Sequence, residues 1–484
     1  MSLFSDKLKS HILETGMTVY VLAKKAGVNR PMIHKAQQGD SVPNDDFIIK
    51  LCEAMMLTPQ EQRDLLLLAR RARMGEALFL RRMAVLDVVN RLCQEFNEMD
   101  LITFYKDRLP IPPDKSYLVL KDQKQIEYIL MDMIKKEAEK EGESSVYFYL
   151  PDHARELFSI IYHLWIESGE DRMKLVQIIG LEKEYQGNHS AVKNLGIISI
   201  ALNYCLVPGK SFGAFYHYLD FPDCKSLPTM PFYVKTSEGL LVLSSGLDKG
   251  AFFRPGPMLD FYEGIIQETI GISKALVSYL TDLFEMFDCG SSQFTLIESI
   301  PCITTVMTDE WVEALVREEL PAEVRKTAVE AAQNEYRRIR RDDSHPISFF
   351  QMDKLERFME DGRIPTVPVS LVRPCTEEER LAMLRGFRKE MDRTSNRIYY
   401  ALDVNKLHLA VDAEVVYSEE KGVIIRVFKN DDAVLTTLLL QEPSCVAAFA
   451  DFFEYLPSSS IVLSKEEMIQ RTDRLIAKYS VKKK

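Results

Sequence analysis

Between Tyr117 and His217 the sequence alternates between short apolar runs and longer amphipathic segments. The runs are rich in β-branched and aromatic residues, whereas the segments between them have the apolar spacing of helices. The expected strands are 117–120, 146–150, 173–179 and 212–217, and the expected helices are 123–141, 153–167 and 189–205. Because such an alternation places consecutive strands side by side with helices across them, it predicts a parallel sheet covered by helices.

Two hairpins follow in the remaining sequence. The first turns at Ser237-Glu238-Gly239, and the second lies in EVVYSEEKGVIIRVF. Each is followed, after about 20 residues, by a proline and an aromatic-bearing helix, at Pro257 and at Pro443. The pattern fits a diverged duplication of one α/β module, or two unrelated hairpins. Helices at about 308–340, 349–360 and 376–392 and strands at 398–401 and 433–439 complete this part.

Helix-start and helix-stop signals in the first 75 residues predict five short helices. Gly16, Gly27 and Gly39 are expected to end the first three, with Thr18 and Asn29 as N-caps of the second and third. A fourth helix is expected at about 44–56. The capping box Thr58-Pro59-Gln60-Glu61 starts a fifth, which runs to about residue 73.

A connecting segment follows these helices. Leu86, Val89, Leu92 and Phe96 form an apolar stripe in a helix expected over 78–96, which we predict to connect or to dimerise, and Pro110, Pro112 and Pro113 close the linker. The expected domains are a helical head over 1–75, this connection over 76–113, an α/β domain over 114–300 and a helical plus α/β domain over 301–484. The predicted fold class is multidomain, with an all-α head and a large mixed α/β body.

The segment from Leu22 to Pro43 resembles the helix-turn-helix of phage-repressor and Cro-type regulators, the xenobiotic-response-element-like family. Residues at the positions that this family uses for packing and turning are Leu22, Ala23, Gly27, Val28, Ile33, Gly39 and Pro43. The resemblance covers only about residues 5–70. It implies a short helix that lies in the major groove of double-stranded DNA.

The outward side of that helix carries side chains that suit DNA. Arg30 and Lys35 can donate to base edges, while Lys24 and Lys25 suit phosphates. The predicted DNA-binding residues are Thr18, Lys24, Lys25, Asn29, Arg30, Pro31, His34, Lys35 and Gln38. The sequence departs from the family at Val19, where a phosphate-contacting Gln is usual, at Gln37, where an acidic residue is usual, and at Pro31, which has no donor. A helical bundle used for protein contacts is the alternative.

Charge is distributed unevenly along the chain. Residues 1–75 contain eleven Lys and Arg against eight Asp and Glu, a net charge of +3. Because the whole chain carries −11, the remaining residues carry −14. An acidic body with a basic head is repelled from a polyanion except at the head. This distribution therefore favours an approach to DNA through the first 75 residues.

Composition and motifs favour a cytoplasmic chain without membrane segments, metal sites or cofactors. No apolar run approaches the roughly 20 residues of a membrane span, and the eight cysteines are scattered singly, without zinc spacing. Pro208-Gly209-Lys210-Ser211 imitates a phosphate-binding loop, but Tyr204 stands where the first glycine is needed. With no GxSxG or GxGxxG motif, the sequence predicts no catalytic residues and no enzyme.

Residues expected at the ends of strands in the body could contact a ligand. They are Tyr149, His153, Arg155, Tyr216 and His217. The body also faintly resembles the degenerate phospholipase-D-like sensor domains of some microbial regulators. The HxKxxxxD signature of the active enzymes is missing, so the resemblance implies binding or dimerisation without hydrolysis.

These observations together predict a function. The chain is expected to be a homodimeric, sequence-specific DNA-binding transcriptional regulator, a repressor, with a non-catalytic body that dimerises or senses a small-molecule or peptide effector. The alternatives are an interaction or phage-defence protein that uses the head as an adaptor, and an enzyme with an unrecognised site. The effector, the operator and the sign of regulation are not determined by the sequence.

Overall fold

The structure, a computed structural model, describes residues 2–93, 115–169, 172–183, 190–207, 209–219, 231–281, 285, 294–341, 346–365, 367–392, 399–428 and 435–480. The chain divides into two compact units. The first is built on Met1–Met83, and the second on Ala84–Tyr185 and Ser190–Lys484. Among the described residues no helix is both long and apolar enough to cross a membrane.

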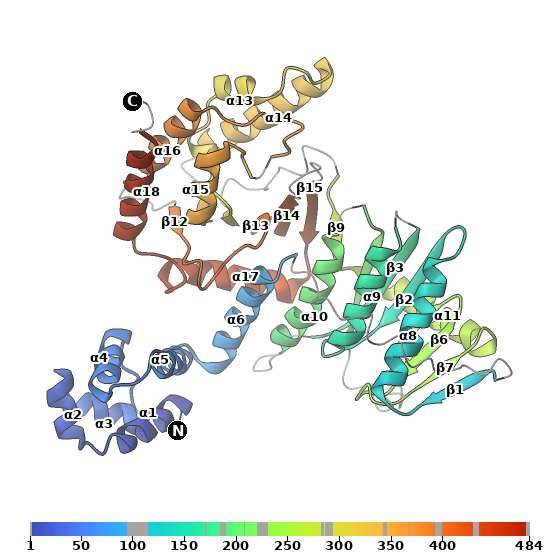
Figure 1. Cartoon of the computed structure of the whole chain (residues 1–484), viewed down its shortest axis with the longest axis horizontal. Coiled ribbons are helices and arrows are strands. Elements are labelled where there is room, and N and C mark those ends of the chain that lie inside the picture. The colour runs from blue at the N-terminus through green and yellow to red at the C-terminus, as the bar shows by residue number, and fades with distance from the viewer. Residues whose placement is uncertain are drawn as a thin grey trace. The chain divides into compact units, whose positions relative to one another are not determined.

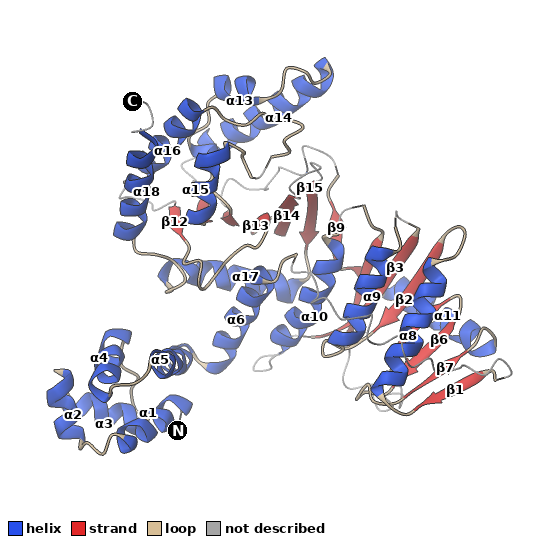
Figure 2. Cartoon of the chain, viewed as in Figure 1, coloured by secondary structure: helices blue, strands red, loops and turns tan. Residues whose placement is uncertain are grey.

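The first unit is made of helices in its described part (Figures 1 and 2). They are α1 (Leu3–Glu14), α2 (Val19–Ala26), α3 (Arg30–Gln38), α4 (Asp45–Met55) and α5 (Pro59–Met74), and α6 (Glu76–Asn90) continues into the second unit. The expected punctuation is confirmed, because Thr18 caps α2, the Thr58–Glu61 capping box starts α5, and Gly27 and Gly39 have positive φ at the ends of α2 and α3. Asn29 holds the N-cap position of α3 but makes no capping hydrogen bond with its side chain.

Helix α6 contradicts only the dimerising alternative for its apolar stripe, because it connects the two units. Val85, Val89 and Leu92 are at most 3% exposed and belong to the main apolar core of the second unit, and Leu86 packs against the same core. They are therefore not available to a partner molecule. Phe96, the last member of the predicted stripe, lies outside the described residues.

The second unit contains two mixed sheets. The first has the order β1-β7-β6-β5-β2-β3-β4-β8 and the second the order β12-β11-β10-β13-β14-β15-β9. The strands of the first are β1 (Tyr117–Leu120), β2 (Ser144–Tyr149), β3 (Met173–Glu182), β4 (Phe212–Leu219), β5 (Phe232–Thr236), β6 (Gly239–Leu243), β7 (Gly250–Phe253) and β8 (Lys274–Ala275). Those of the second are β9 (Val277–Tyr279), β10 (Thr295–Glu298), β11 (Ile347–Phe350), β12 (Tyr399–Ala401), β13 (Asp412–Ser418), β14 (Gly422–Phe428) and β15 (Leu435–Leu440).

The two sheets repeat one topology. Each of β1 to β7 has a counterpart eight strands later, in the same order across the sheet. The directions agree as well, since β2-β3-β4 and β10-β11-β12 are parallel and the remaining pairs of the repeat are antiparallel. The shared topology favours the hypothesis that one α/β module was duplicated over the alternative of two unrelated hairpins.

The helices also correspond between the repeats. One face of the first sheet packs under α8 (Gln123–Ala138), α9 (Arg155–Glu167) and α10 (Ser190–Cys205), and the other under α11 (Pro257–Ile272). In the second repeat the corresponding layer contains η1 (Ile303–Thr305), α13 (Asp309–Leu315), α14 (Ala322–Arg341), α15 (Met352–Asp361), α16 (Glu377–Met391) and α18 (Lys465–Ser480). Helix α17 (Pro443–Tyr455), followed by η2 (Leu456–Ser458), packs on the opposite face.

The predicted fold class, an all-α head followed by a mixed α/β body, is confirmed. The sheets differ in detail from the expectation, because each has an antiparallel half beside its parallel strands. The short strands β10 and β11 were not predicted, and 347–350 is a strand where a helix was expected from 349. A run of four residues is too short to show a period that separates a strand from a helix.

Candidate functional site

The predicted DNA-contacting face is built by α2, α3 and the residues that cap them. Leu22 and Ala23 of α2 and Ile33 and Ala36 of α3 are buried together in the core of the first unit. The helical period then turns the remaining positions outward. The complete predicted set is exposed, as are Tyr20 and Val21 of α2; the set is Thr18, Lys24, Lys25, Asn29, Arg30, Pro31, His34, Lys35 and Gln38.

Contacts within this face are few among the described residues. The Thr18 hydroxyl accepts the Val21 N–H at 3.4 Å, which completes the N-cap of α2. Arg30 Nε donates to His34 Nε2 at 3.4 Å, one turn along α3. Pro31 lies in the first turn of α3, where a missing N–H leaves no helical hydrogen bond unmade.

Other arginines of the first unit are engaged in its structure. Arg70 Nε donates to Asp45 at 2.9 Å, and Arg73 also donates to this carboxylate. Burial alone would raise the pKa of Asp45, but the hydrogen bonds from both arginines outweigh it and hold the pKa below its usual value. These arginines join α5 to the start of α4, so they are poor candidates for contacting DNA.

The five predicted ligand-facing residues do not form one site. Tyr149 and His217 lie on the α11 side of the first sheet, with ring centroids 6.4 Å apart, whereas Tyr216 is buried on the opposite side. Arg155 is exposed at the start of α9, and a ring nitrogen of His153 lies 3.3 Å from the Ser245 carbonyl oxygen. Burial lowers the pKa of His217, whose Nδ1 has no hydrogen-bond partner among the described residues.

A buried polar cluster joins the two repeats. Tyr218 of β4 donates to Glu442, the N-cap of α17, at 2.6 Å. The other oxygen of Glu442 accepts from Ser444 and from the Cys445 N–H, and Asn194 of α10 donates to Ser444 at 3.2 Å. Both oxygens of the carboxylate are used in this way, so the cluster is suited to holding the repeats together.

The second repeat contains an apolar cavity of about 100 Å³ that the sequence did not reveal. Its walls come from η1, α13, α14 and the segment after α15. The lining residues are Ile303, Met307, Val312, Leu315, Val316, Ala328, Ala331, Ala332, Tyr336, Ile364, Val367, Leu371 and Val372. Ala328, Ala331 and Ala332 recur at helical spacing, and this stripe of small residues was the signal available in the sequence. The lining suits an apolar group and offers little to orient a polar substrate.

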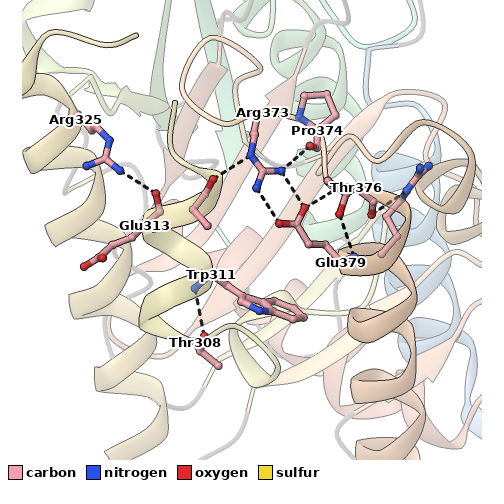
Figure 3. A network of polar contacts seen from close by, with 10 residues as sticks. Thr308, Trp311, Glu313, Arg325, Arg373, Pro374, Thr376 and Glu379 are labelled. Atoms are coloured by element: carbon pink, nitrogen blue, oxygen red, sulfur yellow. Dashed lines mark hydrogen bonds and ion pairs between the residues drawn. The ribbon is translucent and has the colours of Figure 1, made fainter. Parts of the chain in front are cut away.

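A polar network, drawn in Figure 3, begins at Arg373, next to the cavity-lining Val372. Arg373 donates to both oxygens of Glu379, at 2.9 and 2.8 Å, and to the Ala314 carbonyl at the end of α13. Hydrogen bonds from Arg373 are the main reason why the pKa of Glu379 falls to about 2, and the Thr376 N–H contributes to the shift. The network therefore ties the start of α16 to α13, and it leaves the cavity wall apolar.

Comparisons with known proteins give few similarities. No family model and no curated protein matches the chain. Among solved structures, phosphatidylserine synthase of Haemophilus influenzae Rd KW20 has 10% identity and a TM-score of 0.24, over 76% of this chain and 93% of that chain. Polyphosphate kinase of Porphyromonas gingivalis has 10% identity and a TM-score of 0.20, over 75% of this chain and 55% of that chain.

These comparisons contradict two predictions from the sequence. The similar structures are enzymes and neither is a DNA-binding regulator, so the predicted transcriptional repressor with a non-catalytic body is corrected, as is the prediction that the chain is not an enzyme. No comparison supports the resemblance of residues 5–70 to the helix-turn-helix regulator family. Because both TM-scores are this low, the catalytic residues of these two enzymes identify no catalytic residue in this chain.

Proposed function

We propose that the first unit binds double-stranded DNA, with the start of α3 in the major groove. The observation that carries this proposal is the face formed by α2 and α3. It exposes Lys24, Lys25, Arg30 and Lys35, while Leu22, Ala23, Ile33 and Ala36 fix the two helices from behind. The proposal concerns a DNA contact alone and assigns no regulatory role to the chain.

The positions of the four cations determine which part of the DNA each would contact. Arg30 stands at the first residue of α3 and Lys35 lies further along the same helix, so both can reach base edges in the groove. Lys24 and Lys25 end α2, which would cross the sugar-phosphate backbone. Two copies of the face, about one DNA turn apart, would give a useful site length.

The test uses the full chain and duplexes selected from a random library. We expect binding that weakens steeply with salt, because cations that neutralise phosphates release counterions. Arg30→Ala and Lys35→Ala should each cost about 1–3 kcal/mol on the selected duplex and less on random DNA. Lys24→Ala should weaken both duplexes alike and reduce the salt slope by about 1.

Lys50→Ala is the matched control, since Lys50 is an exposed lysine of α4. It should leave the affinity for either duplex within a factor of about two, as expected for a surface change away from the contact. A full chain that enriches no duplex and shows no salt-dependent binding would refute the proposal. Equal losses with Lys50→Ala and Arg30→Ala would refute the assignment of the face.

A further inference from the structure

Helix α11 and the β1 edge expose an apolar surface that nothing in the described part of the chain covers. Its members are Tyr117 (55% exposed), Val119 (61%), Met258 (39%), Phe261 (62%) and Ile272 (78%), here called the α11 face. Tyr117 and Val119 pair with Phe253 and Ala251, which pack with α11, so the five lie on one side of the first sheet. Exposed apolar patches of this kind mark interaction sites.

In the second repeat the corresponding position is covered. The counterpart of α11 is α17, which packs both on β13 and β14 and on α10 of the first repeat. Ala448, Phe449 and Phe452 of α17 are at most 1% exposed as a result. In α11 only Ile266 is buried. Among the described residues, the helix of the first repeat therefore has the sheet on one side and no second layer on the other.

Two glycines add a separate argument. Gly264 lies in the interior of α11 and Gly271 in its last turn, and a Cβ added at either would meet no atom within 4 Å. An interior glycine such as Gly264 costs a helix about 0.5–1 kcal/mol relative to alanine. Packing within the described chain does not require them. Because these glycines have no side chain, another helix has room to approach closely beside Phe261 and Ile272.

We propose that a second copy of this chain covers the α11 face, in a two-fold symmetric dimer. Elsewhere in the described second unit, the large exposed apolar residues Ile166, Tyr279 and Val324 lie on separate elements, so no other apolar surface there matches the α11 face in extent. A surface that is complementary to itself packs on the same surface of its copy, as a two-fold interface requires.

The exposed area is sufficient for such a pair. At roughly 150–200 Å² for each fully exposed large side chain, the five residues offer about 440–590 Å² per copy. A pair would then bury about 900–1,200 Å², and the upper end of this range reaches the lower limit of specific interfaces. Asp260 and Glu268 are also exposed on α11, and helical spacing places Glu268 between Phe261 and Ile272, so the pair must leave room for the two Glu268 carboxylates to stay hydrated.

Sedimentation equilibrium of the full chain between 1 and 50 µM tests the proposal without DNA, so its outcome is independent of the proposed DNA contact. We expect a mass twice that of the 55.7 kDa chain. Phe261→Glu and Ile272→Glu should each produce a monomer with an unchanged circular dichroism spectrum, because both side chains are already exposed. The control Ile166→Glu, on α9, should remain dimeric.

Three outcomes would overturn the proposal. One is a wild-type monomer at 50 µM, and another is a dimer that survives both glutamate substitutions, which would place the interface elsewhere. The third is a monomer that co-sediments with phosphatidylcholine vesicles and loses this property in Phe261→Glu, which would assign the face to a lipid surface. A dimer that is lost in both α11 variants and kept in Ile166→Glu supports the proposal.

Discussion

The two repeats of the second unit share a strand order but differ in one row of buried side chains on corresponding faces of their sheets. In the first sheet Phe148, Val234, Leu241 and Phe252 pair across β2, β5, β6 and β7, and all are buried and apolar. In the second sheet the counterparts β13, β14 and β15 pair Glu414, Arg426 and Thr437, all buried as well, with Glu298 of β10 beside them.

This difference shows that the topology tolerates either solution. An apolar row is stabilised by contact area, which depends little on any one partner. A buried charged row depends on specific pairs, because each charge that loses its partner keeps the cost of its desolvation. Arg426 donates to Glu414 at 2.7 Å, and Ser348 donates to Glu298. The second repeat should therefore respond more sharply to single substitutions.

The largest expected effect is that of Arg426→Met. It leaves Glu414 buried without its cation, so we expect a loss of about 3–5 kcal/mol in the free energy of unfolding, measured with urea. Leu241→Met, at the corresponding strand of the first sheet, should cost less than about 1.5 kcal/mol. The double variant Glu414→Leu with Arg426→Met should recover most of the loss. Equal costs for Arg426→Met and Leu241→Met would remove the distinction between the sheets.

The two corresponding helices, α17 and α11, offer a second comparison. Phe449 is 1% exposed in α17, so Phe449→Ala should lower the free energy of unfolding by about 3–5 kcal/mol. Phe261→Ala in α11, measured in the Ile272→Glu background to exclude contacts between copies, should change it by less than about 0.5 kcal/mol. Chemical denaturation gives both values. A large loss for Phe261→Ala would mean that α11 is covered within the chain.

Glu298 should make the second repeat sensitive to pH. Burial raises the pKa of Glu298 well above its usual value, and the neighbouring Glu414 raises it further. Because the folded state then holds a proton that the unfolded state releases, stability should fall as the pH rises above about 4.5, by up to about 1.4 kcal/mol per pH unit. Glu298→Gln should flatten this part of the profile. Parallel profiles for both proteins between pH 5 and 8 would exclude the effect.

The smallest expected effect belongs to the first sheet. Gln177 of β3 is fully buried, and neither its Nε2 nor its Oε1 has a hydrogen-bond partner among the described residues. A buried amide without partners costs free energy, so Gln177→Leu should stabilise the chain by about 1 kcal/mol. Urea denaturation measures the gain, with Thr437→Val as a comparison in the second sheet. A net loss in Gln177→Leu would indicate that the amide has a partner.

How far the sequence could be interpreted depends on the range of the interactions. The ends of α2, α3 and α5 were predicted from Thr18, Gly27, Gly39 and the Thr58–Glu61 capping box, because these signals act through hydrogen bonds a few residues apart. The exposed face of α3 followed from helical periodicity around Ile33 and Ala36. The strands β10 and β11 were missed because four residues are too few to show a period.

By itself, the sequence determined the helical head, its outward-facing cations and the repeated hairpin followed by a proline and a helix. Only the tertiary structure decided which apolar stripes are inside. The stripe with Val85 and Val89 is buried, whereas the one with Phe261 and Ile272 is open. Likewise, Tyr218 reaches Glu442 across more than two hundred residues of sequence. Spacing along a chain records which side chains share a face, but burial of that face depends on distant segments, which leave no local period.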